Sequence, residues 1–375
     1  MAYIAMFSCV IVLSFIYESI KSKKATSTKV LKGFLAFLIV MIPSVMGGLR
    51  DVSVGTDNFA YRDLFYLARN FISYNEYLKS LSNYTTEVGF TFLVWLSSKI
   101  GGDYRILCFI TSFIAMFFFF KGAKYFIGRS SFTIIIMCYL FVYYCPMYNY
   151  VRQSIALAIC FYAWRYVESK SLFKYVFWVA VAATIHMSAV IMLTVYFLVN
   201  SNIKITRRFI AISIAASFFI IYVGPRLIYI LLLLFSRLGF RSATILSYAE
   251  KFLKSENYLL IPNHLLRSLP QVLFTSFYIK QISIKDEYAN TFFLLCFLQL
   301  PMTIIASVFE PFSRLSFYFN YYTFVLIGEI HINNTKLSKK FMSAALFLYL
   351  VVYWLIFTVN NHYWFAYPVY PYVMA

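Results

Sequence analysis

The sequence predicts an all-α, polytopic membrane protein with about ten transmembrane helices and two further segments that are re-entrant or only half-spanning. Hydrophobic residues make up 62% of the 375 residues and charged residues 13%, which is about half their share in soluble domains. The apolar residues form continuous runs and do not alternate with polar ones. This pattern excludes a soluble enzyme, a disordered chain and a β-barrel, and it predicts one integral membrane domain over residues 1–375.

Each predicted span is an apolar run close to the length of about 20 residues that a helix needs to cross the hydrocarbon core. The runs cover 2–20, 31–47, 104–120, 131–146, 151–168, 209–225, 264–281, 289–308, 314–332 and 341–359. The apolar segment 87–98 is too short to cross, so we expect it to enter and leave on one side.

The formal net charge of +19 comes largely from Lys and Arg in the short segments between apolar runs, which the positive-inside rule places in the cytoplasm. Under this rule both termini lie on the outer side. Residues 48–86 and 236–263 then form outer loops that cap a cavity on that face. The basic segments are 21–32, 121–130, 165–174, 200–208, 280–287 and 333–340.

Residues 172–199 are apolar but carry His186 at their middle. If the basic segments on both sides are cytoplasmic, this stretch must enter the membrane, turn near His186 and return. Each half is too short to cross alone, and irregular backbone at that depth requires surrounding protein or a water-filled cavity. The alternative is one tilted helix that crosses completely.

Three arginines, Arg50, Arg152 and Arg314, lie at the predicted outer ends of spans. The planar guanidinium group binds phosphate through two hydrogen bonds and stays charged. We therefore expect the three groups to lie within about 15 Å of one another in a pocket of ordinary size. Gln153 can hydrogen-bond a phosphate or a sugar, and Tyr61 can contribute to the same substrate site.

His186 is the first candidate for a general base, because imidazole titrates near neutral pH and ionisable groups within spans are commonly functional. Asp57 and Glu87 are the carboxylate alternatives, and His264 and His362 also fall on the predicted outer side. No spacing of His, Cys or acidic residues suggests a metal site, so we expect neither metal nor cofactor.

Several of these residues lie in motifs that resemble one family. The run RDVSVGTDNFAY, residues 50–61, resembles the R-x₃-VGTD-x₃-Y signature of the EpsG family, the Wzy-like polymerases of bacterial surface polysaccharides. Met187 stands where a Lys or Phe is expected, and residues 226–263 match no family pattern. The later motifs follow in the family's order and are Glu87–Phe90, Asn149–Ala156, His186–Ala189, Arg314–Phe319 and Pro371–Tyr372.

The resemblance implies a polymerase in the bacterial inner membrane with its active site facing the periplasm. Its implied reaction moves a growing glycan from undecaprenyl pyrophosphate to the non-reducing end of a lipid-linked repeat unit. The implied partners are these lipid-linked oligosaccharides, membrane lipids, a chain-length regulator and a flippase, and no nucleic acid. The sequence leaves open two other functions, a flippase or transporter of the same lipids and an O-antigen ligase-like transferase.

Overall fold

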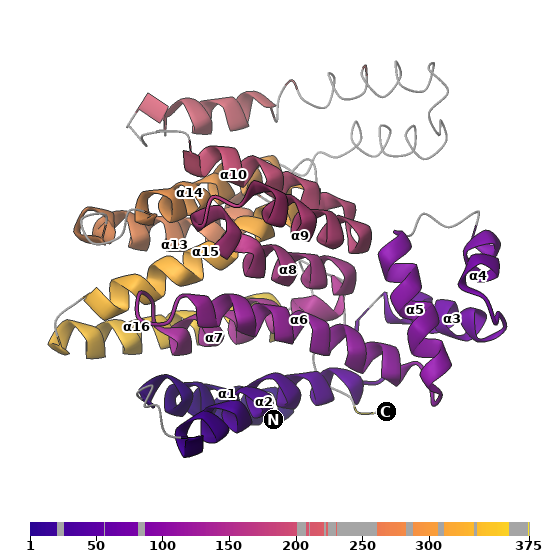
Figure 1. The fold of residues 1–375 in the computed structure, drawn as a ribbon. Helices are drawn as coiled ribbons and strands as arrows, with labels where there is room; N and C mark the ends of the chain where they lie inside the picture. Colours follow the sequence, from indigo (N-terminus) through magenta and orange to yellow (C-terminus); the bar gives the residue numbers. More distant parts are fainter. Residues whose placement is uncertain are drawn as a thin grey trace. The chain divides into compact units, whose positions relative to one another are not determined.

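The computed structural model describes residues 1–20, 26–55, 57–81, 87–200, 261–282, 288–306, 311–333, 336–359 and 374, together with 208–209, 211–220, 223 and 230. All regular elements within these ranges are helical, and the described residues contain no β-strand (Figure 1). The chain divides into two compact units, residues 1–197 with 327–375 and residues 198–326. The all-α prediction is confirmed, whereas the single domain over 1–375 stays a prediction.

Helices coincide with all the predicted spans except 209–225, of which only part is described. In the described residues, four stretches are long and apolar enough to cross a membrane: Ala2–Ser19, Thr26–Gly48, Arg105–Tyr125 and Lys339–Val359. Which of the other helices cross, and in which direction, stays a prediction. The long helices are α1 (Ala2–Ser19), α2 (Thr26–Gly48), α6 (Arg105–Tyr125), α8 (Val151–Glu168), α13 (Ile261–Ile282), α14 (Ala289–Ile305), α15 (Pro311–Asn333) and α16 (Lys336–Trp354).

Two predicted spans contain a π-helical segment. Helix α7 (Phe132–Tyr139) continues as Leu140–Tyr144, and α16 continues as Leu355–Val359. A short 3₁₀ turn, Pro146–Tyr148, then leads from the first of these segments into α8. Segments of π-helix are rare and often lie at functional sites. The segment Leu140–Tyr144 ends eight residues before Arg152.

The segment 172–199 folds as a hairpin. Helix α9 (Leu172–Ile185) ends at His186, a 3₁₀ segment follows at Met187–Met192, and α10 (Leu193–Asn200) comes next. The hydroxyl of Tyr175, in the first turn of α9, donates to the Met192 carbonyl at 2.6 Å, and its ring centroid lies 5.7 Å from that of Tyr196. The chain thus returns to where α9 began. The predicted turn at His186 is confirmed, and one continuous helix is excluded.

Residues 48–86 are more structured than the predicted loop. They contain α3 (Asn58–Arg69) and α4 (Tyr74–Ser80), and α5 (Val88–Ile100) follows. Helix α5 rises only about 20 Å, which is less than the hydrocarbon thickness. Its first turn packs on α3 through Phe90 and Tyr61, whose ring centroids lie 5.0 Å apart. Residues 236–260 of the second predicted loop lie outside the described residues.

Candidate functional site

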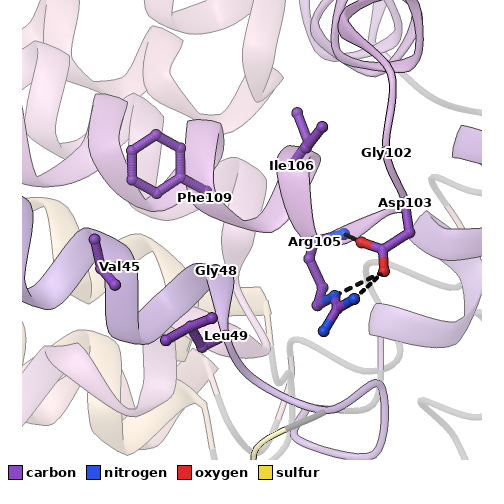
Figure 2. A pocket seen from close by; sticks show the side chains of 8 residues that line it. All are labelled: Val45, Gly48, Leu49, Gly102, Asp103, Arg105, Ile106 and Phe109. Carbon is purple, nitrogen blue, oxygen red and sulfur yellow. Dashed lines mark hydrogen bonds and ion pairs between the residues drawn. The ribbon is translucent and has the colours of Figure 1, made fainter.

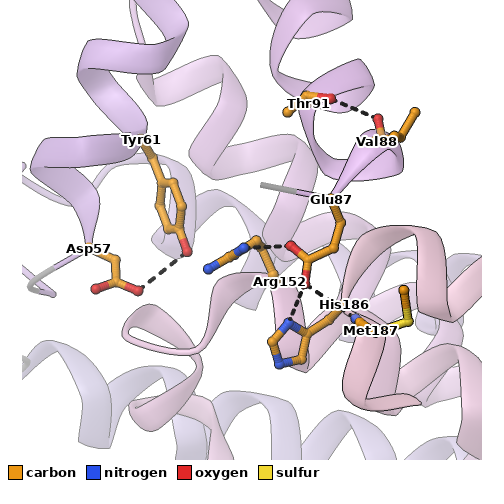
Figure 3. A network of polar contacts seen from close by, with 8 residues as sticks. All are labelled: Asp57, Tyr61, Glu87, Val88, Thr91, Arg152, His186 and Met187. Carbon is orange, nitrogen blue, oxygen red and sulfur yellow. Dashed lines mark hydrogen bonds and ion pairs between the residues drawn. The ribbon is translucent and has the colours of Figure 1, made fainter. Parts of the chain in front are cut away.

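Glu87 connects the residues of the candidate site. One carboxylate oxygen, Oε2, accepts a hydrogen bond from Arg152 Nη1 at 2.5 Å. The other, Oε1, lies 3.0 Å from His186 Nδ1 and accepts from the Met187 backbone N–H at 3.2 Å (Figure 3). One side chain thereby holds the start of α8 and the turn after α9. The structure brings together three predicted site residues from distant parts of the sequence.

The residues that follow Glu87 explain how its carboxylate reaches these partners. A Cβ atom on Gly89 would lie 2.4 Å from Thr184 Oγ1 and 2.8 Å from the Thr184 carbonyl oxygen, so only glycine allows α5 to approach α9 this closely. Phe90 is fully buried, and the Arg152 guanidinium lies 5.9 Å from its ring centroid. In the segment Glu87–Phe90, the glutamate therefore binds Arg152 and His186, Gly89 allows the close helix contact, and Phe90 packs against Arg152.

His186 owes its position to the end of α9. Its backbone is extended, with φ −152° and ψ 112°, while its N–H still bonds to the Ala182 carbonyl at 2.9 Å. The imidazole therefore projects from a helix end, where it is 20% exposed. Within the described part of the chain its Nε2 atom makes no hydrogen bond, so this nitrogen can accept a proton from a substrate.

Asp57 and Tyr61 extend the polar network on the far side of Arg152. Asp57 occupies the N-cap position of α3, but its side chain makes no capping hydrogen bond. It instead accepts from the Tyr61 hydroxyl at 3.3 Å (Figure 3). The Asp57 carboxylate therefore points towards Tyr61 and away from the first turn of α3. Glu87 likewise occupies the N-cap of α5 without capping it.

Arg50 is buried, at 1% exposure, next to the site. Its guanidinium donates to the Gly47 carbonyl and, at 3.1 Å, to Asn58 Oδ1, and it lies 4.5 Å from the Tyr148 ring centroid. Gly55 completes this turn with φ +104°, and a Cβ there would lie 2.7 Å from the Tyr148 carbonyl oxygen. Arg50 thus fastens the turn that leads to Asp57. Its predicted contact with phosphate stays a prediction.

The surroundings of Glu87 and Tyr61 determine their protonation states at neutral pH. Burial works to raise the pKa of Glu87, but the hydrogen bond with His186 and the charge of Arg152 outweigh it and hold that pKa at about 2. Burial raises the pKa of Tyr61 to about 12, against the opposing charge of Arg152. At neutral pH Glu87 is therefore a carboxylate and Tyr61 a protonated donor.

These facts assign different chemical abilities to Glu87 and His186. A carboxylate with such a low pKa is a weak base, and both of its oxygens are already engaged. Because Glu87 accepts hydrogen bonds, it favours the imidazole tautomer with the proton on Nδ1, which leaves a lone pair on Nε2. Such an arrangement can act as a general base that is oriented by a carboxylate. Both groups were base candidates from the sequence, and only the structure distinguishes them.

The other predicted residues have separate settings. Gln153 is 2% exposed and follows Arg152 in the first turn of α8. Arg314 is half-buried and belongs to the second unit, whereas Arg50 and Arg152 belong to the first. The predicted convergence of the three arginines therefore stays a prediction. His362 and the side chain of His264 lie outside the described residues. His331 Nε2 lies 2.8 Å from Ser343 Oγ, well away in sequence from every motif.

Sequence reasoning missed the buried charge of Arg267. Arg267 lies in the first half of α13 and is 9% exposed. Gln271 Nε2 donates to the Arg267 carbonyl at 3.2 Å, and Oγ of the adjacent Ser268 is 2.9 Å from Thr303 Oγ1. The signal was an arginine within an apolar run.

Comparisons with known proteins give one match. The model of the EpsG family matches residues 33–374, which is nearly the whole chain and includes every motif described above. No curated protein and no solved structure matches the chain.

Proposed function

Because the chain belongs to the EpsG family, a family of Wzy-like polysaccharide polymerases, we propose that it polymerises a bacterial surface polysaccharide from lipid-linked repeat units. The observation that carries the site assignment is the Glu87 carboxylate, which holds both His186 and Arg152. The protein acts in the inner membrane, and the site faces the periplasm.

In the proposed reaction the growing glycan is held on undecaprenyl pyrophosphate and moves to the non-reducing end of a new lipid-linked repeat unit. His186 Nε2 accepts the proton of the acceptor hydroxyl. The hydroxyl oxygen forms a bond to the anomeric carbon of the donor, and the bond from that carbon to the pyrophosphate oxygen breaks. The lipid pyrophosphate leaves with the bonding electrons. Glu87 stabilises the imidazolium that forms.

We propose that Arg152 stabilises the charge that develops on the leaving group. Its side chain is 27% exposed, and one terminal nitrogen is used by Glu87. A fixed guanidinium beside the breaking bond stabilises the transition state in a site that contains little water. We propose that this cation makes a metal unnecessary. Arg314 and Gln153 are proposed to contact the substrate, and Asp57 to hold Tyr61 against it.

The test is glycan chain length in a strain that lacks the gene, complemented with the wild type or with Arg152→Ala. The expected result is a ladder of long polymer with the wild type and a single lipid-linked repeat unit with the variant. Arg62→Ala is the matched control, because Arg62 is a surface arginine of α3 whose guanidinium contacts residues of its own helix, Asp63 at 3.0 Å and the Phe59 ring centroid at 5.4 Å. Equal amounts of the proteins in the membrane must accompany the comparison.

The same experiment separates the other functions. If repeat units fail to reach the outer face in the deletion strain, the protein is a flippase. If polymer accumulates on the lipid carrier and is not joined to its final acceptor, the protein is a ligase. Normal polymer with Arg152→Ala at wild-type protein level would contradict the proposed site.

A further inference from the structure

A groove lies between the end of α2 and the start of α6, apart from the network around Glu87. Its volume is about 530 Å³ (Figure 2). Val45 and Leu49 form one wall, and Ile106 and Phe109 form the other. Val45 and Leu49 are 41% and 42% exposed. The volume falls within the usual range for small-molecule sites, and the walls suit a hydrocarbon chain.

The rim of the groove is polar and positively charged. Asp103 and Arg105 lie there and form an ion pair at 2.6 Å (Figure 2). Arg69 donates to the Gly102 carbonyl at 2.9 Å, and Lys99 donates to the Ala68 carbonyl at 3.1 Å. Arg105 thus pairs with Asp103, Arg69 contacts the adjacent Gly102, and Lys99 lies next to Arg69 through the Arg69 carbonyl at 3.3 Å. The side chains of Arg69 and Lys99 are exposed, and the three cations outnumber the one carboxylate. This excess of positive charge complements a phosphate group at the mouth of an apolar groove.

Two parallel helices connect this rim to the candidate site. Helix α3 begins beside Asp57 and Tyr61 and ends at Arg69, and α5 begins beside Glu87 and ends next to Lys99. They touch at both ends, through Tyr61 and Phe90 and through Ala68 and Lys99. From Tyr61 to Arg69 the helix rises about 12 Å. A phosphate at the rim is therefore well separated from His186.

We propose that the groove holds the isoprenoid chain of the acceptor, with the acceptor's phosphate at Arg69, Lys99 and Arg105. This inference rests on the proposed polymerase function. The donor's phosphate is attached to the reacting carbon, so it must lie beside His186. The acceptor's phosphate is separated from the reacting hydroxyl by a whole repeat unit. Only the acceptor fits a phosphate site at this distance, with the oligosaccharide lying along α3 and α5.

The first test fills the groove. Val45→Trp places a large side chain in it without changing the rim or the Glu87 network. We expect at least about a tenfold loss of long polymer and accumulation of single lipid-linked units, because even one methylene of misfit in an apolar pocket costs about 10–200-fold and the indole would take the place of several. Phe37→Trp is the matched control on the same helix, where Phe37 is 55% exposed and lies outside the groove. It should give wild-type ladders.

The second test identifies the occupant. The full chain carrying a photo-crosslinking p-benzoylphenylalanine in place of Leu49 is reconstituted in phosphatidylcholine vesicles that contain undecaprenyl phosphate or, separately, phosphatidylglycerol. Mass spectrometry of the adducts should show the polyprenyl phosphate, and Arg105→Gln should reduce that adduct several-fold. Adducts with phospholipid alone would overturn the proposal, because the groove would then hold only bulk lipid.

The outcomes separate this inference from the proposed function. If the wild type restores polymer while Val45→Trp is normal and no polyprenyl adduct forms, the groove assignment fails and the polymerase stands. If the wild type does not restore polymer, the polymerase fails, and the groove cannot serve an acceptor even where a polyprenyl adduct forms.

Discussion

The two ends of α8 carry similar glutamate networks with different chemistry. At the start of the helix, Glu87 binds Arg152, His186 and the Met187 N–H. At its end, Glu168 accepts from Arg129 at 2.7 Å, from Tyr125 at 2.7 Å and from the Trp164 indole at 2.5 Å. The two ends are about 24 Å apart along the helix.

Burial does not distinguish these networks. The side chains of Glu87 and Arg152 are 17% and 27% exposed, and those of Glu168 and Arg129 are 12% and 28% exposed. The difference lies in the partners. The side chains that bind Glu168 are donors that keep their protons near neutral pH, whereas Glu87 binds an imidazole with a second nitrogen available. The comparison teaches that the Glu168 network, which we call the clamp, and the candidate site around Glu87 are alike in burial and charge. The partner that can titrate near neutral pH, His186, distinguishes the candidate site.

The sharpest way to break this comparison is His186→Ala. If the imidazole is the base, polymerisation should fall by about 10² to 10⁴-fold, the usual contribution of general base catalysis. The measurement is the rate of polymer formation by purified protein in vesicles with lipid-linked repeat units. His331→Ala is the control, because His331 contacts Ser343 far from the Glu87 network. Unchanged rates for His186→Ala would leave both ends of α8 with only structural roles.

Glu87→Gln should have the next largest effect, on the order of a hundredfold in rate. The amide keeps the shape of the side chain but loses the charge that orients the imidazole and pairs with Arg152. The substitution therefore tests orientation by charge. If Glu87→Gln retains the full rate while His186→Ala does not, the carboxylate has no positioning role.

Gly89→Ala tests the approach of α5 to α9. The added methyl group would overlap both the side chain and the backbone of Thr184, so α5 must shift and carry Glu87 away from His186. We expect a loss of about 1–3 kcal/mol in stability, the usual cost of overpacking, with a clear reduction in rate. Thr184→Ala should not rescue it, because the Thr184 carbonyl oxygen remains. Rescue would show that only the side chain matters.

The low pKa of Glu87 predicts which pH range leaves the network intact. A carboxyl whose pKa is lowered from 4.5 to about 2 on folding stabilises the folded state above pH 4.5, and this stabilisation is lost as the pH falls towards 2. The Glu87–Arg152 pair should therefore persist from about pH 5 to 8. The difference in thermal melting between the wild type and Glu87→Gln should be at least as large at pH 5 as at pH 8. A difference that shrinks from pH 8 to 5 would contradict the low pKa.

Glu168→Gln should have the smallest effect on the rate. It removes the charge from the network at the far end of α8, which should cost about 1–3 kcal/mol in stability because three hydrogen bonds to a charged group are weakened. The rate per folded molecule should equal that of the wild type. A large loss of rate without loss of stability would mean that the clamp participates in function.

The sequence was sufficient for the features that depend on local pattern. Apolar runs located the long described helices but not α3 and α4, and the charges on either side of 172–199 correctly required a turn at His186. The motifs identified the family, which the match over residues 33–374 confirms. These inferences work because hydrophobic length and loop charge act on each segment separately.

The sequence could not show what depends on distant contacts. Glu87, Arg152 and His186 are far apart in the chain, so nothing local shows that one carboxylate serves both partners or that its pKa falls. The burial of Arg50 against Tyr148 was equally hidden, since an arginine at the end of an apolar run looks exposed. Arg267 was visible as a charge within a run but lay outside every recognised motif.

The hairpin of α9 and α10 also constrains how the chain is inserted. A segment that returns to its starting side leaves the parity of membrane crossings unchanged, so we expect the residues on either side of the hairpin to share a compartment. A reporter enzyme fused after residue 171 and one fused after residue 200 should therefore respond alike. Under this prediction the backbone turn at His186 sets the side of the membrane on which each later segment begins.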